Sequence, residues 1–209
     1  MKTLILASAS KSRKELLEKL GVPFRVVLSK YEEYMDPKMS AQKLAEHLSY
    51  EKARAVALRH HNAIIIAADT FILFENEFLG KPHTRKKAME MLTRLQGKQH
   101  SIITGFTVLD AQSGKRISKT VEAKITLKKL TQKEIARYAA SDEPLDKAGA
   151  YVIQGLGSVL VKKVEGDFYG AVGLPLGELA DALDFFGIKV LSTRITSLYN
   201  LLETKSDAL

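Results

Sequence analysis

The chain has 209 residues, of which 45% are hydrophobic and 27% charged, with 13 Gly and 5 Pro. A chain of this size and composition buries enough apolar surface to fold without disulfides or a structural metal, which excludes disordered and collagen-like proteins. It contains no Cys, so disulfide scaffolds, cysteine-ligated zinc and thiol catalysis are excluded, and a reducing cytosol fits. No apolar run is long enough for a secretory signal or a spanning helix, so we expect a cytoplasmic protein without a membrane partner.

The formal net charge is +8, and the excess lies in the middle of the chain. Residues 81–137 hold 14 basic and four acidic residues, a net charge of +10. Such a surface binds nucleic acid, anionic lipid or a polyanionic small substrate, or it is simply a solvated face. Few aromatic residues accompany the basic stretch and its helices lack a recognition motif, which disfavours nucleic acid as the partner.

Hydrophobic periodicity predicts alternating strands and helices. In chain order these are a strand at 3–7, a helix at 12–21, a strand at 24–28, a helix at 40–59, a strand at 63–68, a hairpin at 71–79, a helix at 88–97, strands at 101–109 and 118–127, a helix capped by Thr131 and Glu134, a helix at 175–187, and a short strand and tail helix at 188–209. This alternation predicts an α/β fold with an open, largely parallel or mixed sheet. Ligands of such sheets bind beyond the carboxyl ends of strands.

Asp69 follows the apolar run 63–68, in which every position suits a central strand buried on both faces. A carboxylate at the end of such a strand is held rigidly and partly desolvated, as a general base or a metal ligand requires. The alternative is an Asp that caps the next turn.

Three cationic features accompany this carboxylate. The turn from Ser8 through Ser10 to Arg13 offers hydroxyls, backbone N–H groups and a cation at a helix start, which suits a phosphate or an ordinary N-cap. Lys52 lies on the apolar stripe of the 40–59 helix, so it either points into a cleft or bends sideways to solvent. Lys81, in a Gly-Lys-Pro bend, adds a third cation.

The Gly-rich segment 142–173 contains Gln154, which can both donate and accept toward a base or a sugar. Acidic residues, among them Glu33, precede the 40–59 helix. Acids, cations and Gly-rich turns without a reactive Ser-His pair suit a metal-bound polyphosphate, because a divalent ion takes oxygen ligands and cations neutralise phosphates. Only Lys81 of the basic stretch belongs to this set, so most of the positive excess is expected to be surface.

These residues lie in motifs that resemble the Maf family of nucleoside triphosphate pyrophosphatases, relatives of the inosine triphosphate pyrophosphatases. The resemblance covers about residues 3–187. It rests on Leu6-Ala7-Ser8-Ala9-Ser10 with Arg13-Lys14-Glu15-Leu16-Leu17, Glu51-Lys52-Ala53, Ala68-Asp69-Thr70, Leu79-Gly80-Lys81-Pro82, Glu143-Pro144 through Gly155, and Gly173-Leu174-Pro175-Leu176.

The resemblance implies a mixed, strongly twisted sheet flanked by helices, with two lobes around a deep nucleotide-binding cleft in a single catalytic domain, 1–187. It implies hydrolysis of a nucleoside triphosphate at the α–β phosphate link with Mg²⁺ or Mn²⁺, and a homodimer. Carried over by position, Asp69 is the catalytic base and a metal ligand, and Glu33 is the second metal ligand. The phosphate-binding residues are Ser8, Ser10, Arg13, Lys52 and Lys81.

Thr70 and Gln154 match positions that mark the branch of the family acting on dTTP and UTP. The family turn usually reads Ser-x-Ser-Pro-Arg-Arg, whereas this chain has Lys11 in place of the Pro and Ser12 in place of the first Arg. That Arg is linked to substrate choice, and Lys cannot copy its planar bidentate fork, so Ser12 leaves the preferred base open. A 7-methyl-GTP pyrophosphatase, a non-catalytic regulator of septum formation and a nucleic-acid-binding protein are the alternatives.

Overall fold

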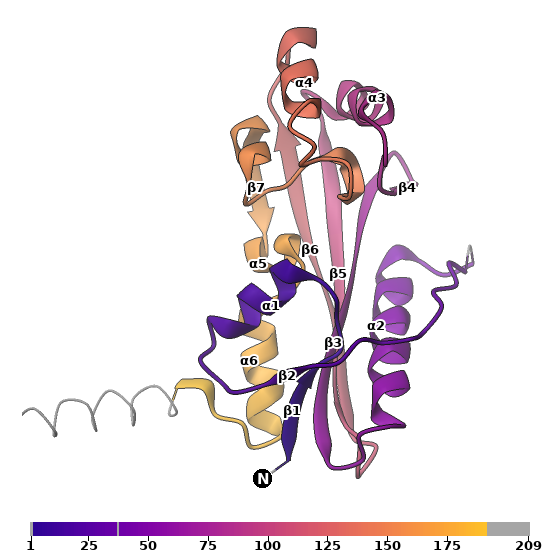
Figure 1. The fold of residues 1–209 in the computed structure, drawn as a ribbon, viewed down its shortest axis with the longest axis vertical. Helices are drawn as coiled ribbons and strands as arrows, with labels where there is room; N and C mark the ends of the chain where they lie inside the picture. The colour runs from indigo at the N-terminus through magenta and orange to yellow at the C-terminus, as the bar shows by residue number, and fades with distance from the viewer. Residues whose placement is uncertain (1, 37, 192–209) are drawn as a thin grey trace, which may run out of the picture.

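A computed structural model describes residues 2–36 and 38–191. Seven strands form one sheet in the order β2-β1-β3-β5-β6-β7, and β4 pairs with β3 (Figure 1). The elements are, in chain order, β1 (Thr3–Leu6), α1 (Lys11–Glu18), β2 (Arg25–Val26), α2 (Ala41–Ala57), β3 (Ala63–Phe74), β4 (Glu77–Leu79), α3 (Arg85–Leu95), β5 (Gln99–Asp110), β6 (Arg116–Leu127), α4 (Gln132–Ala139), the 3-10 helices η1 (Ala148–Ala150) and η2 (Leu156–Leu160), β7 (Val161–Gly166), α5 (Phe168–Val172) and α6 (Leu176–Phe185).

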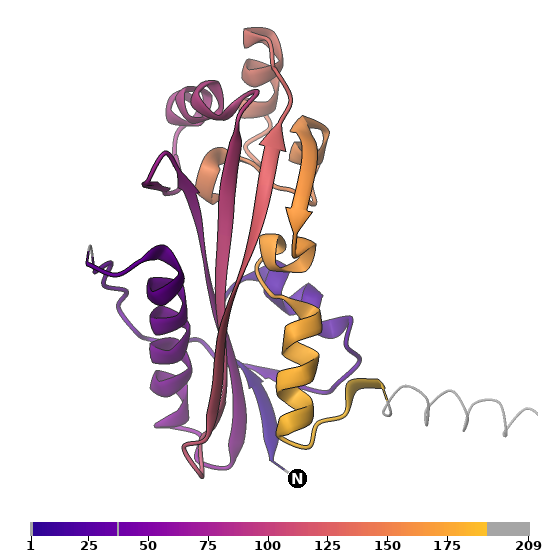
Figure 2. The same cartoon turned by 180° about the vertical axis from the view of Figure 1, so that it is seen from behind.

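The sheet is mixed, as predicted. β1 runs parallel to β2 and β3, whereas every other pairing is antiparallel. β3, β5 and β6 are each 12 residues long and extend along the long axis of the molecule from one end to the other. At the end that contains β1, α2 covers one face of the sheet and α1 and α6 cover the other, while α3 and α4 lie at the opposite end (Figure 2).

Successive side chains of β3 point to opposite faces of the sheet and both faces are apolar, which explains this layering. Ile64 and Ile66 pack with the side chains of α1 and α6, whereas Ile65 packs with Val56 of α2 on the other face. A separate cluster around Leu92 fills the far end of the molecule. Each end of the long strands therefore has its own core, in agreement with the expected two lobes.

β3 corrects one prediction from the sequence. The strand does not end at residue 68 but continues to Phe74, so Asp69 and Thr70 lie in its middle. β5 explains the continuation, because it pairs with β3 residue by residue from Ile64 to Leu73. The polar side chain of Asp69 was therefore mistaken for the end of the strand.

Other boundaries differ as well. Helix α1 begins at Lys11, and Ser10 rather than Ser12 caps it by accepting a hydrogen bond from the Arg13 N–H. The expected strand 24–28 shrinks to β2. The Gly-rich segment contains β7 and α5, which the sequence did not predict, since β7 is mostly exposed and has little apolar pattern. The predicted capping box of α4 is confirmed.

The expected strand and tail helix at 188–209 fall mostly outside the described residues. Residues 188–191 contain no strand, and 192–209 are not described. Within residues 2–36 and 38–191, no helix is both long enough and apolar enough to cross a membrane.

Candidate active site

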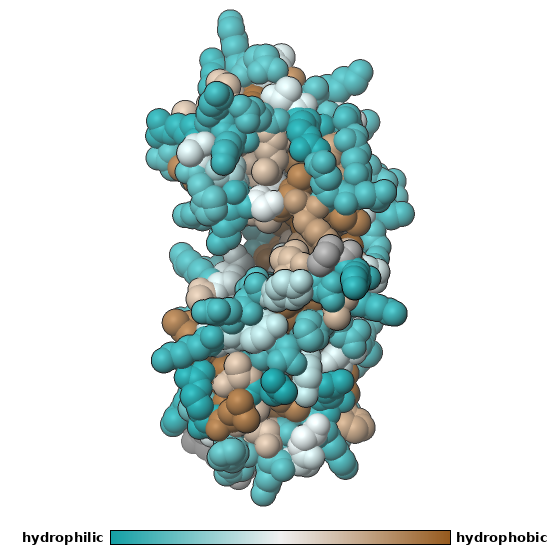
Figure 3. Space-filling view, turned by 90° about the vertical axis from the view of Figure 1, so that its right-hand side faces the viewer, coloured by the Kyte–Doolittle hydropathy of each residue, from teal (hydrophilic) through white to brown (hydrophobic). Residues whose placement is uncertain are grey.

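A large cleft opens where one edge of β3 lacks a partner strand. β1 pairs with β3 only as far as Ile66, and β4 pairs with it from Ile72 onward. Along residues 67–71 β3 pairs only with β5, and the side chains of Asp69, Thr70 and Phe71, from both faces of the strand, line the cleft. The cleft has a volume of about 1110 Å³, and the surface is visibly hollowed between the two ends of the molecule (Figure 3).

All ten site residues predicted from the sequence line this one cleft. They are Ser8, Ser10, Ser12, Arg13, Glu33, Lys52, Asp69, Thr70, Lys81 and Gln154. They come from the turn between β1 and α1, α1 itself, the loop before α2, α2, β3, the turn after β4 and the segment before η2. No other basic residue of the 81–137 stretch lines the cleft, so its positive excess is elsewhere on the surface.

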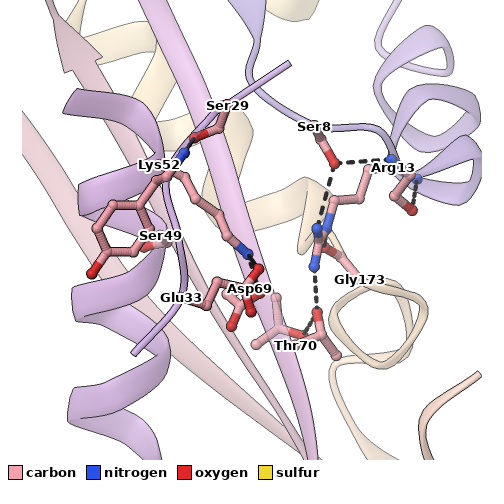
Figure 4. A network of polar contacts seen from close by, with 12 residues as sticks. Ser8, Arg13, Ser29, Glu33, Ser49, Lys52, Asp69, Thr70 and Gly173 are labelled. Carbon is pink, nitrogen blue, oxygen red and sulfur yellow. Dashed lines mark hydrogen bonds and ion pairs between the residues drawn. The ribbon is translucent and has the colours of Figure 1, made fainter. Parts of the chain in front are cut away.

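Asp69, Lys52 and Glu33 form an ion-pair cluster on the α2 side of β3 (Figure 4). The Lys52 ammonium lies 2.5 Å from Asp69 Oδ1 and 2.7 Å from Glu33 Oε1. The side chains of Lys52 and Asp69 are only 12% and 9% exposed, whereas that of Glu33 is 48% exposed. Lys52 therefore points into the cleft, which decides between the two orientations that its helix position allowed.

Burial shapes the chemistry of Asp69. Desolvation raises the pKa of its carboxyl above the ordinary value, the nearby Lys52 and Arg13 cations partly offset this, and the Glu33 carboxylate raises it further. Its second oxygen, Oδ2, is buried and has no hydrogen-bond partner among the described residues. A buried carboxylate with one unpartnered oxygen is suited to accept a proton or to bind a cation.

Helix α2 reaches Asp69 because of a close approach at Gly105. This β5 residue pairs with Asp69 across the sheet. A Cβ atom there would lie 2.3 Å from the backbone carbonyl of Ala45 in α2, so only Gly allows this contact. Lys52 is two helical turns after Ala45, and helical side chains point back toward the N-terminus, which directs its ammonium to Asp69.

Arg13 and Thr70 form the other half of the site, on the α1 side of β3. Arg13 donates from Nε to the Gly173 carbonyl at 2.9 Å, from Nη2 to Thr70 Oγ1 at 3.0 Å and from Nη1 to Ser8 Oγ at 3.4 Å. Burial lowers the pKa of the guanidinium, while the Asp69 and Glu33 carboxylates oppose that effect. Gly173 has φ +125°, a backbone conformation that favours Gly.

Ser12, Lys81 and Gln154 line the cleft without side-chain hydrogen bonds or ion pairs to any other residue in 2–36 and 38–191. The backbone holds the Lys81 turn, because the Gly149 N–H donates to the Gly80 carbonyl. These three side chains are therefore available to a bound molecule.

The segment that carries Gln154 is organised by Glu143. Its carboxylate accepts hydrogen bonds from the N–H groups of Leu156 and Gly157 and from the Tyr138 hydroxyl, at 2.7 to 2.9 Å. A Cβ at Gly155 would meet this carboxylate at 1.8 Å. The absence of a side chain at Gly155 therefore makes room for this structural carboxylate.

Two carboxylates of the cleft, Asp69 and Glu33, fit a divalent cation in part. No group of three or more His, Asp or Glu side chains that could hold a metal occurs within residues 2–36 and 38–191. Mg²⁺ usually takes one or two carboxylates and completes its shell with water and substrate phosphates. The unpartnered Asp69 Oδ2 and the half-exposed Glu33 agree with such a shared site.

Comparisons with known proteins show the family of this chain. The family model described as Maf-like protein matches residues 3–186. A "dTTP/UTP pyrophosphatase" of Methanococcoides burtonii is 48% identical over 91% of this chain and 98% of its own length. One of Desulforamulus reducens is 42% identical over 91% of this chain and all of its own. A solved Mycobacterium abscessus structure titled "Nucleoside-triphosphatase / dITP/XTP pyrophosphatase" aligns with 61% of this chain and 75% of its own, at 13% identity and a TM-score of 0.37, too weakly to carry functional information. With the family model spanning nearly the whole described chain, this protein belongs to the Maf-like protein family.

Proposed function

We propose that this chain is a nucleoside triphosphate pyrophosphatase of the dTTP/UTP type, which hydrolyses the α–β phosphate link to a monophosphate and pyrophosphate. The observation that carries the proposal is the Asp69–Lys52–Glu33 cluster, which shares one cleft with Arg13 and Lys81. The relatives named dTTP/UTP pyrophosphatase, 42% and 48% identical over nearly their full lengths, support the same reaction.

Asp69 is the proposed general base. Its raised pKa makes it a stronger proton acceptor than an exposed Asp, and Lys52 on Oδ1 leaves Oδ2 free to take a proton from the attacking water. Lys52 also holds Glu33 beside Asp69. With Asp69, Glu33 would hold Mg²⁺ or Mn²⁺, which supplies positive charge next to the phosphates when it is bound.

The triphosphate is assigned to the cationic side chains and to the start of α1. Arg13, Lys52 and Lys81 neutralise phosphate charge. The β- and γ-phosphates gain negative charge as the α–β link breaks, so these cations stabilise the transition state. Ser8 and Ser10 add hydroxyls at the N-terminus of α1, where the helix dipole favours anions.

The nucleobase is assigned to Ser12, Thr70 and Gln154. Ser12 and Gln154 line the cleft with free side chains. Ser12 is shorter than the Arg that the family usually has, so the base makes fewer contacts on that side. We expect UTP and dTTP to remain the best substrates and the selectivity to be looser than in relatives with Arg at this position.

The test is pyrophosphate release from a panel of nucleoside triphosphates with Mg²⁺ or Mn²⁺. Asp69→Asn keeps the size of the side chain and should lower kcat by about 10²- to 10⁴-fold, the usual contribution of a general base. Asp184→Asn, an exposed Asp of α6, is the matched control and should leave kcat unchanged. No release from any triphosphate, or near-wild-type turnover of Asp69→Asn, refutes the assignment. EDTA tests the metal, since chelation should abolish release.

A cytoplasmic location and a homodimer remain predictions from the sequence and the resemblance. The same Asp69→Asn variant separates the enzyme from a non-catalytic regulator of division, because only a regulator keeps its cellular effect without turnover.

A further inference from the structure

A buried threonine outside the cleft is hydrogen-bonded to Thr70. Thr104 of β5 is fully buried and does not line the cleft. It pairs with Thr70 across the sheet, and the two hydroxyl oxygens lie 2.8 Å apart. Thr104 Oγ1 also lies 2.8 Å from the Gly170 carbonyl oxygen of α5. One chain of hydrogen bonds therefore joins Arg13, Thr70, Thr104 and Gly170.

The chemistry of the two ends fixes the direction of every bond in this chain. A carbonyl oxygen only accepts, so Thr104 gives its single proton to Gly170. Thr70 must then donate its own proton to Thr104. A guanidinium only donates, so Arg13 uses one of the two lone pairs of Thr70 Oγ1. Thr70 keeps one lone pair and has no proton left for a substrate.

We propose that Thr104 makes Thr70 a pure hydrogen-bond acceptor toward the nucleobase and thereby selects pyrimidines that carry a ring N–H. Uracil and thymine have N–H at ring position 3, which can donate to Thr70. Cytosine has an unprotonated nitrogen at that position, and two acceptors that face each other cannot form a hydrogen bond. Thr104 is thus a positioning residue that acts through Thr70. This inference rests on the proposed pyrophosphatase activity.

A second hydroxyl chain on the opposite face of β5 provides a matched comparison. Thr107, also fully buried, lies 2.8 Å from Ser49 of α2 and 2.8 Å from Ser118 of β6. Thr107 and Thr104 are on the same strand and each joins a buried chain of hydroxyls, yet the hydroxyls bonded to Thr107 belong to Ser49 and Ser118 and not to Thr70. Replacing either hydroxyl by a methyl group should destabilise the protein to a similar degree, so only base selection tells them apart.

The experiment compares kcat/KM for UTP and CTP in the wild type, Thr104→Val, Thr104→Ser and Thr107→Val. In Thr104→Val the Thr70 hydroxyl loses its acceptor, so its proton can be donated to the cytosine ring nitrogen. We expect the UTP-to-CTP ratio to fall by about tenfold, mainly through a rise in kcat/KM for CTP. Thr104→Ser keeps the hydroxyl and should restore the ratio. Thr107→Val should keep the wild-type ratio even if its melting temperature falls.

An unchanged ratio in Thr104→Val, or an equal fall in Thr107→Val, overturns the inference and leaves the pyrophosphatase assignment intact. Absence of release from UTP and CTP alike refutes the proposed function instead. A further measurement needs no variant, and so holds even if Thr104→Val does not fold. The wild type should reject N3-methyl-UTP about as strongly as CTP, since the methyl group replaces the donated N–H, and equal use of UTP and N3-methyl-UTP overturns the inference.

Discussion

Gly105→Ala is expected to damage the active site although Gly105 does not line the cleft. The added Cβ would lie 2.3 Å from the carbonyl carbon and oxygen of Ala45 and 2.5 Å from the next backbone nitrogen, where ordinary contacts begin at 3.4 Å. Neither neighbour is the flexible end of a side chain. Helix α2 and strand β5 must therefore separate by about 1 Å, and overpacking of this kind costs roughly 1–3 kcal/mol of unfolding free energy.

The separation reaches the chemistry because each element carries or supports one partner of an ion pair. Lys52 lies on α2, and Asp69 pairs directly with Gly105. A displacement of about 1 Å in a catalytic group costs on the order of 100-fold in rate, so we expect kcat/KM to fall between 10- and 100-fold.

The assay is pyrophosphate release combined with urea unfolding. The matched control is Gly177→Ala in α6, where a Cβ meets nothing within 4 Å. This exposed helical position should gain about 0.4–1 kcal/mol and keep full activity. If Gly105→Ala unfolds at the wild-type urea concentration and turns over at the wild-type rate, the proposed dependence of the site on this close approach is wrong.

Three further predictions concern residues around the cleft. Burial lowers the pKa of His100 to about 4, so its contribution to stability is complete above about pH 6.5 and is lost as the pH falls toward 4. Urea unfolding should show that this group loses about 3 kcal/mol of unfolding free energy between pH 7 and pH 4. The loss should be absent in His100→Gln. A His100→Gln protein with the same pH dependence would contradict this. Glu143→Ala removes the acceptor of three hydrogen bonds, so it should lower the unfolding free energy by about 2 kcal/mol and raise KM as the Gln154 segment loosens. Glu178→Ala loses only an exposed ion pair and should change little in urea unfolding or in KM. Lys81→Met should lower kcat/KM by about tenfold or more. It should leave the unfolding free energy within about 0.5 kcal/mol of the wild type, since Lys81 is exposed and its side chain bonds to no described residue. An unchanged kcat/KM would remove Lys81 from the triphosphate site.

Local patterns in the sequence were sufficient to predict many of the helices, strands and caps of this protein. The apolar stripe of α2, the capping box of α4 and the alternation in β6 depend on residue spacing within one element, so periodicity and capping rules predict them. The ten site residues also share one cleft, as the motifs indicated. Lys52 shows the limit, because its place on an apolar stripe allowed two orientations and only its distance from Asp69 decides between them.

Long-range pairing decided the rest. β3 continues through Asp69 because β5 pairs with it along its length. β7 has little apolar pattern and is a strand because β6 supplies its partner. Gly105 and Thr104 matter through Ala45 and Thr70, which lie 60 and 34 positions away in the chain. Composition and motifs thus indicated the protein family and excluded thiol chemistry. The tertiary structure alone decided which side chains touch, since close approach and hydrogen-bond direction depend on residues far apart in the sequence.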